Sequence, residues 1–145
     1  MDKETLRTMT SPCGLPCFHC QAYLAKTDSE IRKRVAATLG IPTEKAACEG
    51  CRPQKGCIAL LNQNKTCRIF LCAAEKGNDF CYECDNFPCE RFQPYADKAQ
   101  FPHNTKMYQL CMMKKLGIEK WASEMATKIW DTYRSEPFDF NNILY

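Results

Sequence analysis

The residues with the clearest capacity for chemistry in this sequence are its cysteines, which number 12 in 145 residues. Three pairs have the spacing C-x2-C, namely Cys17/Cys20, Cys48/Cys51 and Cys81/Cys84. Two intervening residues form a tight turn that directs both sulfurs to one ion, which supplies half of a tetrahedral zinc site. Because each pair also has further cysteines within ten residues of it, the spacing predicts bound metal.

We expect the ligands among the eleven cysteines that precede Cys111, which stands apart in the sequence. These candidates are Cys13, Cys17, Cys20, Cys48, Cys51, Cys57, Cys67, Cys72, Cys81, Cys84 and Cys89. The two members of a C-x2-C pair should share one ion, while the other five cysteines can complete any of the sites. Two four-cysteine sites use eight ligands, and three sites need a twelfth ligand from elsewhere, such as His19. We therefore expect two or three zinc ions, most of them structural.

Disulfides and an iron–sulfur cluster account for the cysteines less well than zinc does. Disulfides belong to oxidising compartments, whereas the charged and polar residues 1–5 are followed by no apolar export segment, so we expect a cytoplasmic protein. The string Cys13-x3-Cys17-x2-Cys20 resembles the cluster-binding signature of radical S-adenosylmethionine enzymes. Those enzymes build a barrel of roughly 200 or more residues from alternating strands and helices, and no such alternation follows Cys20. A [4Fe–4S] centre without that enzymology is kept as the alternative to zinc.

Charge and hydropathy limit the classes of partner. The formal net charge is +3, but each zinc with four thiolates carries a net charge of −2. Two such sites therefore bring the chain to −1 and three bring it to −3, which weakens the case for nucleic-acid binding. Solvated helix faces account for the basic clusters 32–34 and 114–115. The mean hydropathy is −0.47, and no apolar run reaches the roughly 18 residues of a membrane span.

Short helices must position the cysteines, because the sequence shows no convincing strand pattern. Asp28 caps a predicted helix with an apolar stripe of Ile31, Val35 and Leu39, and Gly40 ends it. A helical turn is predicted at 43–45, and short helices are predicted at 57–62, at 68–76 and from Phe87-Pro88 to Lys98. The fold class is therefore small and mainly helical, with metal-stabilised cysteine-rich knuckles and short helices followed by a C-terminal helical hairpin.

The predicted hairpin occupies the C-terminal third of the chain. Asn104 or Thr105 caps a helix that ends at Gly117 and places Cys111 in a buried setting beside Leu110 and Met107. A second helix is predicted over 118–134. We expect a cysteine-rich metal-binding region at 1–98 and the hairpin with its tail at 99–145, packed as one domain. The tail 138–145 is apolar enough to dock on the domain or on a partner.

Five strings of residues carry a family resemblance. They are Cys13-Gly14-Leu15-x-Cys17-x2-Cys20-Gln21-Ala22-Tyr23, Cys48-x2-Cys51-x5-Cys57, Cys67-Arg68-Ile69-Phe70-Leu71-Cys72-Ala73, Glu75-Lys76-Gly77 and Cys81-x2-Cys84-x2-Phe87-Pro88-Cys89-Glu90. In this order they resemble the family known as domain of unknown function 3795, over about residues 10–92. The resemblance implies a cytoplasmic protein that holds zinc through these cysteines, and it implies no particular reaction. Some relatives carry another cysteine pair near the C-terminus, which this chain lacks.

Three functions are compatible with these features. The favoured one is a metal-stabilised interaction module that binds a protein partner and needs no catalytic residue. The second is an enzyme, or a sulfur- or metal-transfer protein, with an open zinc or a [4Fe–4S] site and with Asp79, Glu83 or Asp85 as proton acceptor. The third is a nucleic-acid binder built on zinc knuckles. We leave open whether the protein is an enzyme, because its two histidines form no recognisable catalytic arrangement.

Overall fold

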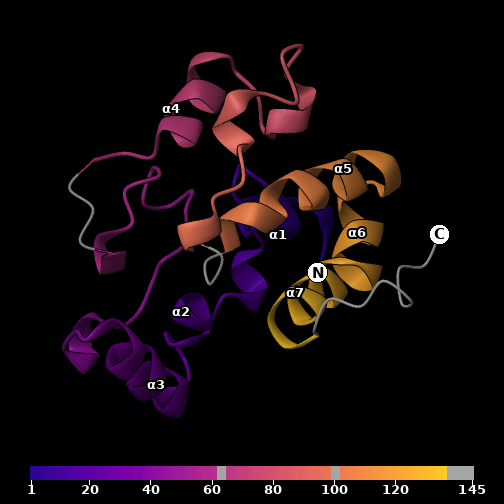
Figure 1. Cartoon of the computed structure of the whole chain (residues 1–145). Coiled ribbons are helices and arrows are strands. Elements are labelled where there is room, and N and C mark those ends of the chain that lie inside the picture. Colours follow the sequence, from indigo (N-terminus) through magenta and orange to yellow (C-terminus); the bar gives the residue numbers. More distant parts are fainter. Residues whose placement is uncertain (62–64, 99–101, 137–145) are drawn as a thin grey trace.

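The protein is built from short helices joined by turns (Figure 1). The computed structural model describes residues 1–61, 65–98 and 102–136. The α-helices in these ranges are α1 (Lys3–Thr8), α2 (Gln21–Leu24), α3 (Ser29–Leu39), α4 (Arg68–Glu75), α5 (Lys106–Leu116), α6 (Ile118–Glu124) and α7 (Ala126–Ser135). The same ranges contain no strand beyond one isolated bridge between Thr10 and Pro16. The prediction of a small, mainly helical, cysteine-rich fold is confirmed.

Short 3-10 turns connect these helices, and several of them lie in the cysteine-rich half. They are η1 (Cys17–His19), η2 (Thr43–Lys45), η3 (Ala59–Leu61), η4 (Cys81–Glu83), η5 (Glu90–Phe92), η6 (Ala96–Lys98) and η7 (Pro102–Thr105). Within the described part of the chain, no helix is long and apolar enough to cross a membrane.

Helix α3 begins and ends where the sequence predicts. The Asp28 carboxylate accepts the backbone N–H groups of Glu30 and Ile31 at 2.9 and 3.0 Å, which satisfies two donors that a helix start leaves unpaired. At the other end Gly40 takes a left-handed conformation with φ 64°. Helix α4 also confirms its prediction, with Gly77 two residues beyond its last residue.

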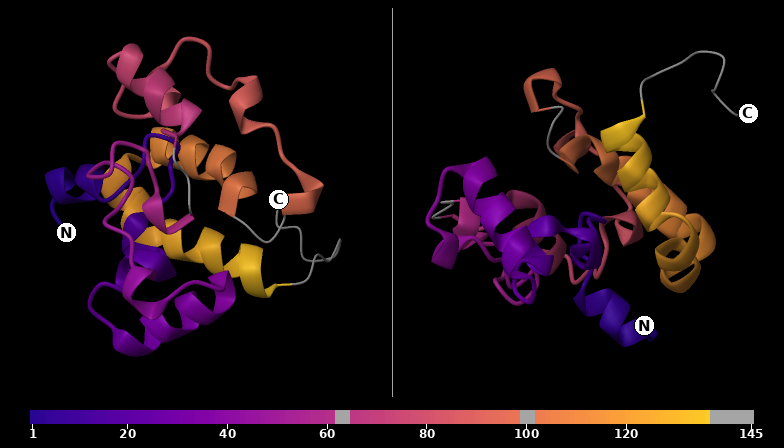
Figure 2. Two further views of the ribbon diagram at one scale, coloured as in Figure 1. Left: turned by 90° about the vertical axis from the view of Figure 1, so that its left-hand side faces the viewer. Right: turned by 90° about the horizontal axis from the view of Figure 1, so that it is seen from below.

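A single hydrophobic core joins the cysteine-rich half to the C-terminal helices. Its centre is Trp121, which is fully buried and whose indole N–H donates to the side-chain oxygen of Gln109 at 2.7 Å. Buried residues from both halves pack in this core, namely Leu6, Cys13, Ile69, Phe80, Phe92, Leu110, Met113, Ile118, Trp121 and Ala126. Figure 2 shows α5, α6 and α7 gathered on one side, with α2 and α3 on the other in its right-hand view. The small core around α3, formed by Ala25, Val35, Ala36 and Ala46, is separate.

Gly14 brings the first cysteine motif into close contact with α5. Its φ of +86° is a conformation that residues with a side chain rarely adopt, and a methyl group added there would lie 2.9 Å from Cγ of Leu110. Leu110 is fully buried and therefore has no free space into which to move. The tight spacing fixes the loop between Cys13 and Cys17 against the core.

Replacing Gly14 should therefore cost more stability than replacing a glycine in open space. Gly40 is the matched control, because its φ is also positive but no atom lies within 4 Å of an added methyl group. We expect Gly40→Ala to lower the free energy of unfolding by about 1 kcal/mol, from backbone conformation alone. Gly14→Ala adds overpacking and should cost about 2–4 kcal/mol. Denaturant titration measures both, and equal losses for the two variants would contradict the tight contact with Leu110.

The helix predicted from Phe87-Pro88 to Lys98 is wrong. The structure has two separate turns there, η5 and η6, with Pro94 between them. Proline lacks a backbone N–H and disfavours the helical conformation of the residue before it, and Gln93 accordingly has an extended ψ of 127°. The predicted helix at 57–62 is shorter than expected over its described residues, which contain only η3.

Two features of the predicted hairpin also differ. The helix expected over 118–134 is divided at Met125 into α6 and α7. A straight helix would place Trp121 and Ala126 about 140° apart around its axis, so the two side chains would face different sides. The chain changes direction between α6 and α7, and both side chains are buried. Cys111 is exposed rather than buried, because α5 turns Leu110 and Met113 to the core and successive residues lie about 100° apart. The tail 138–145 lies outside the described residues.

Candidate metal centre

Two groups of four cysteines come together in the fold. We call Cys17, Cys20, Cys48 and Cys51 the first cysteine cluster, and Cys72, Cys81, Cys84 and Cys89 the second cysteine cluster. None of these eight residues is in a disulfide. Two segments far apart in sequence therefore build the first cluster.

The first cysteine cluster is held together by backbone contacts between its two halves. Cys17 begins η1 and Cys20 ends it, with the N–H of Cys20 donating to the carbonyl of Cys17 at 2.9 Å. The backbone N–H of Cys48 donates to the carbonyl of Ala22 at 2.8 Å, and the N–H of Cys51 donates to the Cys17 sulfur. The second C-x2-C pair is thereby fixed against the first.

Amide groups also point at the sulfur of Cys48. The backbone N–H of Gly50 donates to this sulfur at 3.4 Å and the side-chain amide of Gln54 donates to it at 3.1 Å. The Cys20 sulfur accepts the backbone N–H groups of Ala22 and Tyr23. Such donors stabilise a thiolate, which is the form of cysteine that binds metal.

Burial favours the protonated form of Cys17, Cys20 and Cys51 in the first cluster, because it raises the pKa of each thiol. Desolvation raises the pKa of Cys17 to about 11, and the neighbouring thiolates of Cys20 and Cys48 contribute to this rise. Burial also raises the pKa of Cys51 to about 12. A bound divalent cation would favour the thiolate form instead of the thiol. Its own charge would be the largest in the site and would deprotonate the coordinating thiols.

The second cysteine cluster lines a small cavity. All four sulfur-bearing residues, Cys72 from α4, Cys81 and Cys84 from the two ends of η4, and Cys89, border a cavity of about 30 Å³. Burial raises the pKa of Cys81 to about 12, and the thiolates of Cys72, Cys89 and Cys84 add to this rise, as does that of Cys13. The four cysteines therefore border one cavity, together with apolar side chains such as Ile69 and Phe87.

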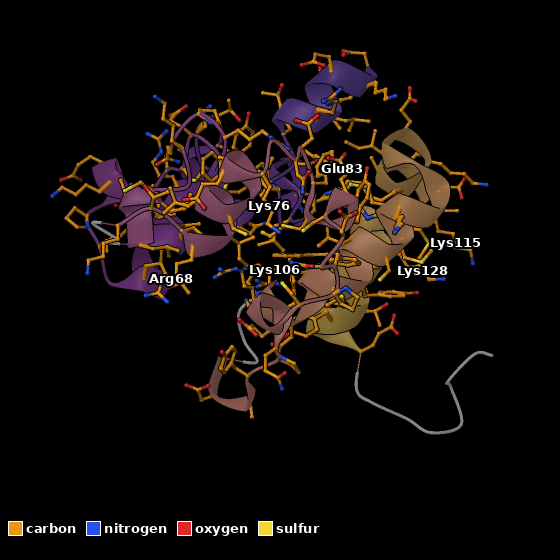
Figure 3. All side chains as sticks on the ribbon, turned by 90° about the horizontal axis from the view of Figure 1, so that it is seen from above. Arg68, Lys76, Glu83, Lys106, Lys115 and Lys128 are labelled. Atoms are coloured by element: carbon orange, nitrogen blue, oxygen red, sulfur yellow. The ribbon has the colours of Figure 1, made fainter. Side chains whose placement is uncertain are left out.

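Cys84 differs from the other members of the second cluster in its environment. Its sulfur accepts the backbone N–H of Asn86 and the ammonium group of Lys76, whose Nζ lies 3.3 Å away. These two donors lower the pKa of Cys84 below its ordinary value. Lys76 extends from the end of α4 and is labelled in Figure 3, where sulfur atoms lie beside it. Neither Lys76 nor Asn86 was predicted as a site residue, although Lys76 belongs to the string Glu75-Lys76-Gly77 that shares in the family resemblance.

Of the remaining predicted ligands, Cys13 is electrostatically coupled to Cys17 and Cys51 of the first cluster and to Cys81 of the second. Cys13 is buried in the hydrophobic core beside Ser11, whose hydroxyl lies 3.1 Å from its sulfur. Cys67 precedes α4 and is electrostatically coupled to Cys51. Cys57 lies in the turn before η3, where its backbone N–H donates to the carbonyl of Gln54.

The thiol groups of both clusters are suitable ligands for zinc, although their sulfur atoms do not lie at the mutual distances of metal ligands. Across residues 1–61, 65–98 and 102–136, no three His, Cys, Asp or Glu side chains already converge as closely as metal ligands do. Each cluster nevertheless offers four thiols, and structural zinc prefers four sulfur or nitrogen ligands.

The histidines and carboxylates considered for catalysis have contacts of their own. His19 hydrogen-bonds the hydroxyl of Thr127 on α7, and His103 contacts the carbonyl of Gln93 at 2.9 Å. The Glu83 carboxylate accepts the backbone N–H groups of Asp79 and Phe80 at 2.8 and 3.2 Å. Asp79 itself pairs with Arg7 and with Arg52. These groups therefore hold the fold together.

Fold and site define a small helical protein in which eight of the twelve cysteines form two groups of four. The chain belongs to the family described as protein of unknown function (DUF3795), whose model matches residues 9–94. The family resemblance seen in the sequence is thereby confirmed. No curated protein and no solved structure matches this chain.

Proposed function

We propose that this protein binds two zinc ions, one at each cysteine cluster, and that the metals stabilise a module for interaction with a protein partner. Each ion would be held by four thiolates in a closed tetrahedral site, which is the arrangement of structural zinc. A reducing cytoplasm is part of the proposal, because zinc thiolates persist where disulfides do not form.

The observation that carries the zinc assignment is the cavity bordered by Cys72, Cys81, Cys84 and Cys89. Cys81 and Cys84 of this set form a C-x2-C pair, the spacing that supplies half of a tetrahedral zinc site. The first cluster has the same set of four thiols from two C-x2-C pairs. A [4Fe–4S] cluster held by the same cysteines is the alternative, and the mass of the bound metal distinguishes the two.

The two competing functions receive less support from the described residues. An enzyme with an open zinc needs an available proton acceptor; Asp79 and Glu83 are already engaged in the fold, which leaves the exposed Asp85 as the candidate. A nucleic-acid binder needs a free basic face. Arg32 instead donates to the backbone carbonyls of Ala25 and Lys26, and Lys33 pairs with Glu30 at 2.8 Å.

Substitution of single cysteines tests the proposed sites. We expect Cys72→Ser to lower the zinc content from two ions per chain to one, because it removes one ligand of the second cluster. Cys111→Ser is the matched control, since Cys111 is exposed on α5 outside both clusters, and it should keep two ions. Elemental analysis of protein purified under reducing conditions measures the ratio. Two zinc ions in Cys72→Ser, or one in Cys111→Ser, would contradict the assignment.

A further inference from the structure

A groove on the surface of the C-terminal helices lies apart from both cysteine clusters. It has a volume of about 360 Å³ and is bordered by α7 and by η7 with the start of α5, elements that the left-hand view of Figure 2 shows close together. We call it the α7 groove. Tyr108, Met125, Ile129 and Tyr133 contribute apolar surface to its walls. None of the described residues that border it is a cysteine, so the groove is separate from the proposed metal sites.

Aromatic side chains are exposed at the α7 groove. Tyr108 borders the groove and is 54% exposed. Tyr95 is 52% exposed, and the side chain of Asn104, which also borders the groove, bonds the backbone N–H and carbonyl of Tyr95 at 3.0 and 3.2 Å. Exposed apolar side chains that gather at one place mark a binding surface, whereas scattered ones need no explanation.

Helix α7 directs the chain toward this groove at its C-terminal end. Ile129 and Glu136 are seven residues apart, which is nearly two helical turns, so the two positions lie on the same face. The N–H of Glu136 still donates to the carbonyl of Thr132, a residue that borders the groove, at 3.2 Å. Its ψ of 127° then ends the helix, and Pro137 cannot continue it. The chain therefore leaves α7 on the face that borders the groove.

The segment that follows has sufficient length and apolar side chains to cover the α7 groove. Nine residues, 137–145, come after Glu136, and a chain of this length reaches about 30 Å when extended. By comparison, a helix rises only about 10 Å between Ile129 and Glu136. Large apolar or aromatic side chains make up five of the nine, namely Phe138, Phe140, Ile143, Leu144 and Tyr145.

The charges of the groove and of this segment are complementary. Lys128 borders the groove, is exposed and is labelled in Figure 3. Asp139 is the only acidic or basic residue in the sequence 137–145. Opposite charges on two surfaces fix how they align and disfavour other occupants.

We propose that the α7 groove binds residues 137–145 of its own chain. The rings of Phe138 and Phe140 cover its apolar walls, and Asp139 pairs with Lys128. A protein partner would reach this groove only by displacing the segment. The inference goes beyond the proposed function and does not depend on bound zinc.

NMR spectroscopy of the full-length protein with labelled methionine and isoleucine methyl groups tests the contact. We expect nuclear Overhauser contacts from the rings of Phe138 and Phe140 to the methyl groups of Met125 and Ile129. The double variant Phe138→Ser, Phe140→Ser should remove these contacts and shift both methyl signals. The signal of Met113, which is fully buried in the core, is the control and should stay in place. A mixture of two differently labelled samples separates contacts within one chain from contacts between copies.

A peptide titration tests the charge pair. In the double variant the groove is open, and an N-acetylated peptide of residues 137–145 should bind there and restore the methyl shifts. Adding Lys128→Glu should weaken the peptide by about two- to fivefold, and a peptide with Asp139→Lys should recover the loss. Lys45→Glu is the matched control, because it makes the same change of charge at an exposed position of η2.

Three results would overturn the inference. They are methyl signals that do not respond to the double variant, ring contacts that form between copies, and equal peptide affinities for Lys128→Glu and Lys45→Glu. Zinc content is measured separately on the same samples. A chain without zinc in which the segment docks would contradict the proposed function alone, and a zinc-loaded chain in which it does not dock would contradict the inference alone.

Discussion

Removing the metal with a strong chelator under reducing conditions should unfold this protein. A structural zinc site contributes on the order of 10 kcal/mol of apparent binding energy to folding, whereas a domain of this size is stable by only about 5–15 kcal/mol. From the sequence we expect residues 11–89 to unfold and the C-terminal helices to persist in part. Trp121 is buried in the same hydrophobic core as Cys13, Ile69 and Phe80 of the cysteine-rich half. Chelation should therefore expose Trp121 to water.

Tryptophan fluorescence measures this exposure. Trp130 is only half-buried and lies beside Arg134 with 4.3 Å between the guanidinium and the ring, so Trp130→Phe isolates the signal of Trp121. We expect a shift of the emission to longer wavelength on chelation and its reversal when zinc is returned. Unchanged emission, with metal removal verified by elemental analysis, would show that the fold does not depend on metal.

Truncating Trp121 should produce the largest loss of stability of any single core substitution. Its side chain is fully buried, and Trp121→Ala leaves a cavity at the contact between the two halves of the chain. Such substitutions cost about 3–5 kcal/mol. The variant also removes the donor to Gln109, whose side chain is itself fully buried. An unpaired buried acceptor adds about 1–3 kcal/mol to the loss.

Denaturant unfolding of zinc-loaded protein measures this effect. Trp130→Ala serves as the comparison, because it removes the same side chain from a half-buried position of α7 and should cost about 1 kcal/mol. A similar loss for the two variants would mean that Trp121 is not the centre of the core. A loss of zinc in Trp121→Ala at temperatures where it stays folded would show that core packing also shapes the clusters.

The parts of the fold that follow local rules could be predicted from the sequence. Asp28 and Gly40 mark the ends of α3 through capping, and the C-x2-C spacing of Cys17/Cys20 and Cys81/Cys84 forms tight turns at η1 and η4. The errors have physical reasons. The helix predicted from Phe87-Pro88 to Lys98 does not form, because Pro94 lacks the backbone N–H that a helix interior needs. The break between α6 and α7 at Met125 coincides with no glycine or proline, so the sequence contains no local signal for it. This break depends on tertiary packing.

The grouping of cysteines could not be predicted, because it depends on which segments meet. Spacing predicts that Cys81 and Cys84 act together, but it does not select Cys72 and Cys89 from the unpaired candidates. Only the fold brings α4 against η4, and thereby closes a cavity with four cysteines. The Lys76 contact with Cys84 likewise joins residues from different elements and leaves no pattern in the sequence.

Native mass spectrometry of protein purified without air tests the central claim most directly, because it reports the identity and number of bound metals in one spectrum. Two zinc ions per chain, held against a mild chelator, are the predicted result. A mass increment of a four-iron cluster would contradict the assignment to zinc. A metal-free folded chain would contradict metal stabilisation altogether.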